Sequence, residues 1–202
     1  MEKTKNIILK EGFSSVLRNG IKAFTVENLA SSLAMSKKTI YQYFPKKEIL
    51  IKKIIDHRMN KLTNEFKDII GEHNDAMMQF IKIRNHHRKF SNQFNLKKLT
   101  NLKARYPEIW INIEKHRNDR KAVYREIFTL AKSQSYLRDN LDPDVCSSIY
   151  MNIINTTFQP EFLNENNLDI GDAINHLRTI ISNGFFNNSG IKMMNKCEGL
   201  AS

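Results

Sequence analysis

The sequence predicts an all-α protein of about nine helices, on the basis of two observations. The 202 residues include only 7 glycines and 4 prolines, which are too few turn residues for a fold of many short strands. Apolar side chains also recur at the three- and four-residue spacing of amphipathic helices along most of the chain. Because no apolar run approaches the roughly 18 residues needed to span a bilayer, we expect a cytoplasmic protein without a membrane partner.

Start and stop signals divide the N-terminal third into four expected helices. Gly20 can end the first helix, because glycine adopts the left-handed conformation that closes a helix. The hydroxyl groups of Thr25 and Ser36 can cap the N-termini of the next two. Pro45 then interrupts the chain, and a long helix that begins directly after it is expected to end near Gly71.

The rest of the chain shows the same kind of signals. A helix is expected over residues 75–94, followed by a basic connection and by one long helix that begins at Pro107. Asp142 and Pro143 form a cap and a first helical position, which predicts the next helix. The last helix is expected to begin near Asp169, after a loop rich in Asn and Glu.

Positive charge is concentrated in two segments of a chain whose formal net charge is +11. Residues 1–62 contain 13 Lys and Arg against 5 Asp and Glu, and residues 76–107 contain 8 basic residues and no acidic one. Residues 108–202 are close to neutral, with 10 basic and 12 acidic residues. A basic N-terminal third joined to a near-neutral C-terminal half favours a polyanion-binding head on a different body. The alternative to a polyanion-binding site is an ordinary surface whose lysines are only solvated.

Residues 25–50 contain the most informative pattern of the chain. Two short predicted helices are separated by a tight turn over residues 33–35, and the second is too short to be stable alone. Ile40 and Phe44 of this second helix are expected to pack inward. Its polar side chains can reach base edges, and they are Lys37, Lys38, Thr39 and Gln42. This arrangement is typical of a helix-turn-helix reader of the DNA major groove, and an ordinary helical hairpin with a solvated basic face is the alternative.

This segment resembles the DNA-binding region of the tetracycline-repressor (TetR) family of transcriptional regulators. The resemblance covers about residues 5–55 and is strongest in the run SKKTIYQYFPKKEIL. The positions that carry it are Ile8, Gly20, Thr25, Val26, Leu29, Ala30, Ser36, Lys37, Thr39, Ile40, Tyr41, Tyr43, Phe44, Pro45, Lys47, Glu48, Ile49 and Leu50. The sequence departs from the family at Ala34, where glycine is usual in the turn, and at Lys38, where a small residue is common.

The resemblance implies a domain organisation and a function. It implies a helix-turn-helix DNA-binding domain over residues 1–48 and a helical effector-binding and dimerisation domain over residues 49–188. We expect residues 189–202 to form a flexible tail. A TetR-like protein is expected to bind a palindromic operator in double-stranded DNA as a homodimer, and to be released as a repressor by an unknown small-molecule effector. Activation instead of repression is an alternative.

The resemblance also implies roles for nine DNA-binding residues, which are Thr25, Ser36, Lys37, Lys38, Thr39, Tyr41, Gln42, Tyr43 and Lys47. Thr25 and Ser36 cap helices whose N-termini suit contact with phosphates. The two tyrosines are expected to clamp the DNA backbone, with packing as the alternative, and Lys47 is expected to bind a phosphate. The remaining four are candidates for base edges, because lysine suits guanine acceptors, glutamine suits adenine and threonine suits the thymine methyl group.

In the C-terminal domain, the last two long helices are expected to pair with a second subunit. The candidate interface residues are Val145, Ile149, Ile153, Ile174, Leu177 and Ile181. The candidate walls of an effector pocket are Met77, Met78, Phe80, Phe90, Phe94, Trp110, Tyr124 and Phe128. Packing in an intramolecular core is the alternative for both sets.

The basic residues of the segment 76–107 are Lys82, Arg84, Arg88, Lys89, Lys97, Lys98, Lys103 and Arg105. They can attract an anionic effector, lie near DNA, or form a solvated helix face. The same segment motivates a different class of function, a basic helical adaptor that binds acidic proteins or anionic surfaces.

Other classes of function find little support in the sequence. It contains no phosphate-binding GxxxxGK[ST], no HExxH and no GxSxG motif, so we expect no enzyme. Cys146 and Cys197 form no CxxC pair, which argues against a disulfide framework or a zinc ribbon. His86 and His87 are adjacent and would point about 100° apart on a helix. We therefore expect neither a metal nor a cofactor.

Overall fold

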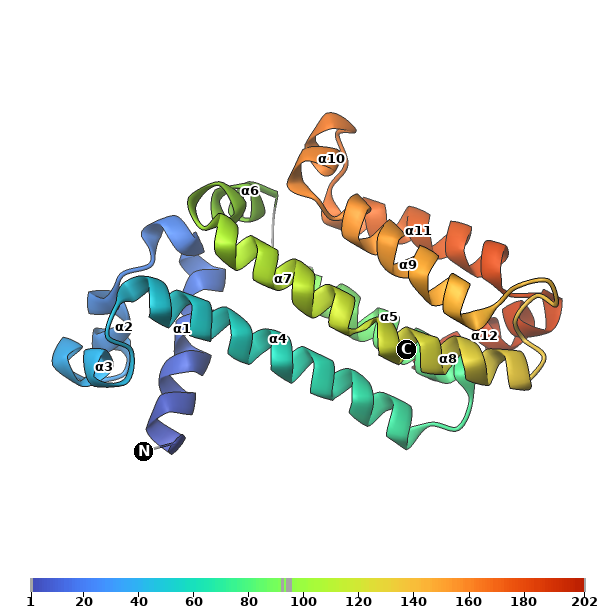
Figure 1. Cartoon of the computed structure of the whole chain (residues 1–202), viewed down its shortest axis with the longest axis horizontal. Coiled ribbons are helices and arrows are strands. Elements are labelled where there is room, and N and C mark those ends of the chain that lie inside the picture. The colour runs from blue at the N-terminus through green and yellow to red at the C-terminus, as the bar shows by residue number, and fades with distance from the viewer. Residues whose placement is uncertain (1, 92, 94–95, 202) are drawn as a thin grey trace. The chain divides into compact units, whose positions relative to one another are not determined.

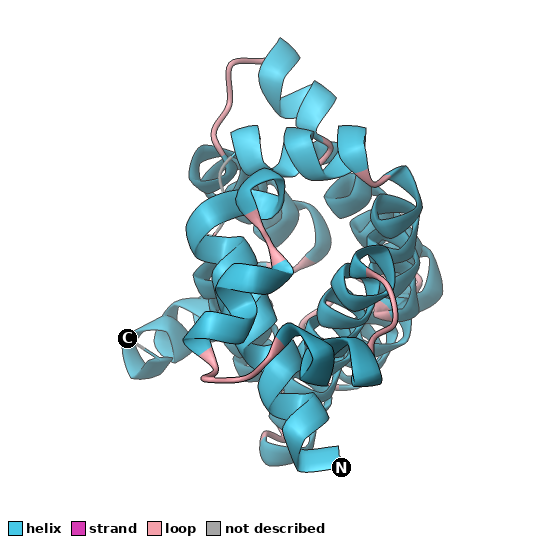
Figure 2. Cartoon of the chain, turned by 90° about the vertical axis from the view of Figure 1, so that its left-hand side faces the viewer, coloured by secondary structure: helices cyan, strands magenta, loops and turns pink. Residues whose placement is uncertain are grey.

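The computed structural model describes residues 2–91, 93 and 96–201, and it confirms the all-α prediction (Figure 1). These residues form helices and loops, with one isolated bridge between Leu137 and Phe186 (Figure 2). The helices of the described residues are α1 Glu2–Ala23, α2 Val26–Ser32, α3 Lys37–Tyr43, α4 Lys47–Glu72, α5 Ala76–Ser91, α6 Leu96–Arg105, α7 Pro107–Asp119, α8 Lys121–Ser133, α9 Pro143–Thr157, α10 Pro160–Glu165, α11 Ile170–Phe185 and α12 Asn188–Ala201.

The chain divides into two compact units. The first unit contains Met1–Leu62 and Lys97–His116, and the second contains Thr63–Leu96 and Arg117–Ser202. The unit that contains the predicted DNA-binding domain therefore extends beyond residue 48 and includes most of α6 and α7.

In the first unit, α1 packs through the face that the sequence predicts. The buried residues of this face include Ile8, Gly12, Phe13 and Val16. Gly12 allows a close approach to α4, because a Cβ atom there would lie 2.4 Å from Cδ1 of Ile54. Gly20 has φ 76° and ψ 161°, a conformation that is open almost only to glycine, and it kinks α1 where the sequence predicted a helix end. Lys98 of α6 donates a hydrogen bond to the carbonyl of Leu17 near this break.

The second unit has an aromatic core. The ring centroid of Phe80 in α5 lies 5.3 Å from that of Phe186 and 5.9 Å from that of Tyr150. Phe128 of α8 lies 5.1 Å from Phe185 and 6.0 Å from Phe186. Edge-to-face and offset contacts at these separations stabilise the packing beyond the area that they bury. The core therefore joins α5, α8, α9 and α11.

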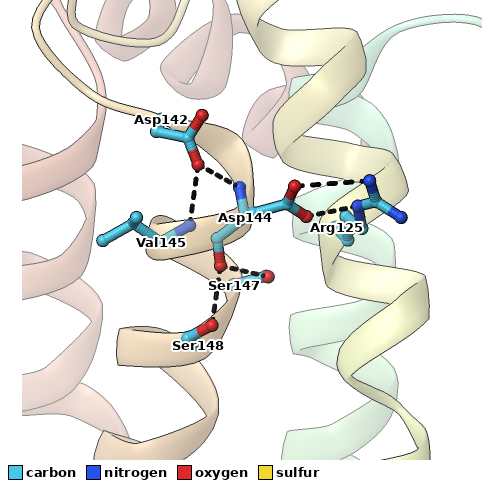
Figure 3. Close-up of polar contacts among 6 residues, drawn as sticks. All are labelled: Arg125, Asp142, Asp144, Val145, Ser147 and Ser148. Carbon is cyan, nitrogen blue, oxygen red and sulfur yellow. Dashed lines mark hydrogen bonds and ion pairs between the residues drawn. The ribbon is translucent and has the colours of Figure 1, made fainter.

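The start of α9 is fixed by the predicted cap. The Oδ1 atom of Asp142 accepts hydrogen bonds from the backbone N–H groups of Asp144 at 2.9 Å and Val145 at 3.0 Å (Figure 3). Pro143 occupies the first turn, where its missing N–H costs nothing. Arg125 of α8 forms an ion pair with Asp144, which connects the two helices at their surface.

Two expectations about the middle of the chain are wrong. The single helix expected from Pro107 is two helices, α7 and α8, separated at Arg120, which has φ −76° and ψ −5°. The apolar periodicity continues across this break, so the sequence pattern did not reveal it. The expected basic connection contains α6, whose basic residues had obscured its helical character.

The prediction of a flexible tail over residues 189–202 is also wrong, because this segment forms α12. Asn187 caps α12 by accepting hydrogen bonds from the N–H groups of Ser189 and Gly190, each at 3.0 Å. Met194 and Cys197 of α12 are buried. The helix packs against α5, and this apolar contact explains why the segment is ordered despite its polar composition.

We predict that Asp142→Ala lowers the free energy of unfolding by about 1 kcal/mol, because two N–H groups lose their acceptor. Urea denaturation followed by circular dichroism measures this change. Asp139→Ala is the matched control, since Asp139 is exposed and its backbone carbonyl, not its side chain, accepts the bond from Lys132. An equal loss in both variants would contradict the capping role.

Candidate DNA-binding site and ligand pocket

Helix α3 is held by a small apolar core in the first unit. Ile40 and Phe44 are fully buried, as predicted, and α3 packs against α2, whose Leu29 is buried as well. A helix of seven residues is not stable alone, so this burial fixes both the position and the rotation of α3. The fixed rotation decides which side chains face outward.

The two predicted caps are present at the starts of α2 and α3. Thr25 Oγ1 accepts a hydrogen bond from the N–H of Asn28 at 3.1 Å. Ser36 Oγ accepts one from the N–H of Thr39 at 3.0 Å and lies 2.9 Å from Thr39 Oγ1. Both hydroxyl groups therefore serve as caps, and a role for them in binding phosphates stays a prediction.

The turn between α2 and α3 has the left-handed conformation that the family's glycine would suit. Ala34 has φ 50°, and the turn is closed by a 2.9 Å hydrogen bond from the N–H of Met35 to the carbonyl of Ala30. A left-handed conformation costs a residue with a Cβ atom about 1–2 kcal/mol. The chain therefore carries local strain at the point that sets the angle of α3.

The outward face of α3 is polar. Lys38 and Gln42 are exposed and lie one helical turn apart, on the face opposite Ile40. Thr39 is half-buried at the edge of this face. A polar face on one side of a short helix after a tight turn is the arrangement of a helix-turn-helix protein.

Lys37 has a partner that the sequence analysis missed. Its Nζ atom lies 2.7 Å from Oε1 of Glu27 in α2. This hydrogen bond raises the pKa of Lys37 and lowers the pKa of Glu27. The lysine remains charged, but an approaching phosphate or guanine must compete with the carboxylate. Lys37 and Glu27 lie on different helices, ten residues apart, so helical spacing in the sequence could not reveal that they pair.

The three remaining predicted DNA contacts lie near the C-terminal end of α3. The side chain of Tyr41 is 41% exposed, whereas that of Tyr43 is half-buried. Lys47, in the first turn of α4, has its Nζ atom 5.9 Å from the centroid of the Phe24 ring. This cation–π contact restrains the lysine while its charge stays near the surface.

The second unit contains a pocket between α5, α9 and α11. Its empty volume is about 440 Å³, including the space at its open mouth. The apolar walls include Ile154, Phe158 and Leu177, and the polar walls include Arg84, Arg88, His87 and Arg178. Burial lowers the pKa of His87 to about 3, with Arg120 and Arg117 adding to the effect, so this ring is neutral near pH 7.

The structure supports only part of the predicted pocket lining. Phe80 lines the pocket, and Tyr124 and Phe128 are buried behind it, with their ring centroids 4.4 and 6.1 Å from that of Tyr150. Trp110 does not line it, because this residue is buried in the first unit, where its Nε1–H donates to Glu114. Phe90 is buried elsewhere in α5. Phe94 lies outside the described residues.

Methionines at the start of α5 were also candidates for the pocket. Met77 is fully buried and Met78 is half-buried, and neither lines the pocket. The branched aliphatic walls and Arg178 come from α9 and α11, which carried no predicted pocket residue, whereas Arg84 and Arg88 come from α5. Their sequence separations, from α5 to α11, explain why no local pattern linked them.

Helices α9 and α11 carry exposed apolar side chains. Val145 and Ile149 of α9 are 53% and 47% exposed, as an interface with another molecule requires. Ile180 of α11 is 64% exposed and was missed. The prediction for Ile181 is wrong, because this residue is buried and lines the pocket.

The other members of the predicted interface are half-buried. Ile174 and Leu177 line the pocket, and Ile153 lies beside the exposed stripe of α9. The sequence stripe of α11 therefore faces the interior of its own unit, and the exposed Ile180 points about 100° away from the adjacent Ile181. Two apolar residues in a row left the edge of the buried face undefined, so periodicity alone did not assign Ile180 and Ile181.

The described part of the chain contains no group of three or more His, Cys, Asp or Glu side chains that could hold a metal ion. Within the same residues, no helix combines the length and hydrophobicity needed to cross a membrane.

A capped short helix after a tight turn, with a polar outer face in a cationic segment, defines a helix-turn-helix DNA-binding protein. Residues 8–54 match the family described as bacterial regulatory proteins, tetR family. Along 178 residues the chain is 23% identical to the uncharacterized HTH-type transcriptional regulator YvaF of Bacillus subtilis (strain 168). The aligned residues make up 88% of this chain and 93% of that protein. Residues 8–54 are therefore similar to the DNA-binding region of the TetR family of transcriptional regulators.

Solved structures share the fold over nearly the whole chain. A TetR transcription regulator from Haloarcula marismortui ATCC 43049 has a TM-score of 0.66 at 9% identity, covering 93% of this chain and 100% of that one. A putative transcriptional regulator from Saccharomonospora viridis, in complex with choline, has a TM-score of 0.65 at 13% identity and the same coverage.

We predict that Ala34→Gly raises the free energy of unfolding by about 1 kcal/mol, because glycine adopts φ 50° without a steric cost. Chemical denaturation of the full chain measures the change. Ala104→Gly places glycine in the right-handed backbone of α6 of the same unit and is expected to give no gain. If Ala34→Gly were also destabilising, the turn would not be strained.

Proposed function

We propose that the chain is a repressor that binds a palindromic DNA operator as a homodimer and is released by a small-molecule effector in the cytoplasm. The observation that carries this proposal is the outward face of α3. Lys38 and Gln42 are exposed, while Ile40 on the opposite side is completely buried. The polar side chains are therefore available to a partner and are not used by the fold.

The chemistry of this face suits the major groove. A lysine ammonium group can donate to the acceptors of guanine, and a glutamine amide can form two hydrogen bonds with adenine. We expect the phenol of Tyr41, in α3, and Lys47, in the first turn of α4, to contact phosphates. Phosphate contacts fix the register of the protein, and base contacts read the sequence.

Two copies of the chain are needed for specific recognition in this proposal. One short helix contacts few base pairs, whereas two copies spaced about 34 Å apart, or a multiple of this distance, read a palindrome. The exposed apolar residues Val145, Ile149 and Ile180 on α9 and α11 are the surface that we propose for pairing. Their burial in a dimer would remove apolar area from water.

The pocket of the second unit is the proposed effector site. Its lining combines apolar walls with a few polar groups that can orient a ligand, as is usual for small-molecule sites. The structure of the Saccharomonospora viridis protein contains choline, which supports a small organic ligand as the class of effector for this fold. We propose no enzymatic activity and no cofactor.

The adaptor alternative is less well supported. The basic residues of segment 76–107 do not form one free surface, since Arg84 is paired with Glu198 and Lys98 donates to the carbonyl of Leu17. The segment is also divided between the two compact units. A single docking surface for acidic proteins would require these charges to lie together and unengaged.

We predict that Gln42→Ala and Lys38→Ala change base preference, by about 1–3 kcal/mol at each affected base pair where a bidentate contact is lost. Lys47→Ala should instead weaken binding to all duplexes by a similar factor and reduce the salt dependence by about one phosphate contact. Fluorescence anisotropy measures both effects, using a palindromic duplex selected from a random library and single-base variants of it. Unchanged base preference after replacement of Lys37, Lys38, Thr39 and Gln42 would rule out this face.

We predict that Ile149→Glu combined with Ile180→Glu converts the dimer into monomers. Each fully buried isoleucine contributes about 1.5–3 kcal/mol, so the dissociation constant should rise by about a hundredfold or more. Sedimentation velocity measures the change. Ile111→Glu is the matched control, because Ile111 is 65% exposed on α7 in the first unit. A dimer that survives the double substitution would contradict the proposed surface.

A further inference from the structure

The pocket of the second unit has an excess of positive charge at one end. Arg84 and Arg88 of α5 and Arg178 of α11 line it. Glu198 of α12 lies 2.6 Å from Arg84 and 2.5 Å from Arg178, each distance measured between a carboxylate oxygen and Nη2. The two oxygens of one carboxylate thus bridge two arginines, and the charge of Arg88 remains.

A further guanidinium group lies behind the pocket. Arg120 is only 4% exposed, and its Nη1 atom is buried without a hydrogen-bond partner. Its guanidinium carbon lies 5.9 Å from the centroid of the Phe66 ring, and the charge of Arg120 acts on His87, which lines the pocket. Burial lowers the pKa of Arg120. Tyr124 and Asp119 act against this shift, but a buried guanidinium N–H group without an acceptor is costly, so this site favours a hydrogen-bond acceptor nearby.

Arg84 also has a guanidinium nitrogen that makes no hydrogen bond. Its Nη2 atom binds Glu198, but its Nη1 atom is buried and has no hydrogen-bond partner. A planar guanidinium group offers donors in a fork that matches the two oxygens of a carboxylate. The pocket therefore has donor capacity in excess of what Glu198 satisfies.

We propose that the effector is an organic carboxylate with an apolar body, and that Glu198 occupies the place of its carboxylate in the free protein. This inference rests on the proposed function of the pocket as an effector site. The apolar body fits against Phe80, Ile154, Phe158 and Leu177. A carboxylate is chosen over other anions because the side chain now held by Arg84 and Arg178 is itself one.

Binding of such an effector has a consequence for α12. The carboxylate of the effector competes with Glu198 for Arg84 and Arg178, and its arrival releases the C-terminal end of α12 from α5 and α11. The packing of Met194 and Cys197 holds the helix in place up to the residue before Glu198. Glu198 therefore acts as an internal competitor that lowers the affinity for the effector.

Calorimetric titration of the full chain without DNA tests the proposal. The probes are octanoate, octanol and octyltrimethylammonium, which share the apolar chain and differ in the charge of the head. Octanoate is expected to bind at least tenfold more tightly than the other two. Arg84→Gln and Arg178→Gln should each weaken octanoate binding by about 10- to 100-fold, the range for a lost charge-assisted hydrogen bond.

Glu198→Gln is expected to bind octanoate several-fold more tightly, because the internal competitor loses its charge. A damaged fold would not produce such a gain in affinity. Lys192→Gln, at an exposed position of the same helix, is the matched control and should leave the affinity unchanged. Failure of octanoate to bind, equal binding of octanol, or no gain in Glu198→Gln would overturn the proposal.

The same titrations distinguish this proposal from the proposed function. Octanoate that binds with the expected dependence on Arg84, Arg178 and Glu198 supports the carboxylate site, whatever its effect on DNA. Loss of DNA binding in anisotropy assays of the free protein would refute the repressor role alone. Octanol binding as tightly as octanoate, with DNA binding intact, would refute the carboxylate site alone.

Discussion

The DNA-binding site depends on the burial of two side chains. Helix α3 has seven residues and cannot persist in water alone, so Ile40 and Phe44 must anchor it in the core of the first unit. The anchoring fixes the rotation of the helix and places Lys38 and Gln42 outward. The same few residues therefore stabilise the local fold and select the side chains that can meet a partner. Strain at Ala34 is tolerated because this core holds both ends of the turn.

Local features of the chain could be predicted from the sequence. Thr25, Ser36 and Asp142 are caps because each presents a side-chain oxygen directly before an apolar helical pattern, and such signals act within three residues. The resemblance of residues 36–50 to the TetR family also rests on neighbouring residues within one short segment. The burial of Ile40 and Phe44 also followed from helical periodicity, since the two residues lie one turn apart on one face.

Features that depend on distant segments could not be predicted in this way. Glu198 pairs with Arg84, 114 residues earlier, and no local pattern links the two. Ile181 and Ile180 are adjacent in sequence but face opposite environments, and Trp110 belongs to a different unit from the pocket. The helical character of the last segment was missed because its stability comes from packing of α12 on α5 and not from its own composition.

Hydrogen–deuterium exchange of the full chain, with and without a random-sequence DNA duplex at low ionic strength, tests the central claim most directly. If α3 enters the major groove, the backbone amides of residues 36–47 become protected when duplex is added, and more so than those of α9 and α11. Protection confined to the second unit, or exchange in residues 36–47 that the duplex leaves unchanged, would contradict the account.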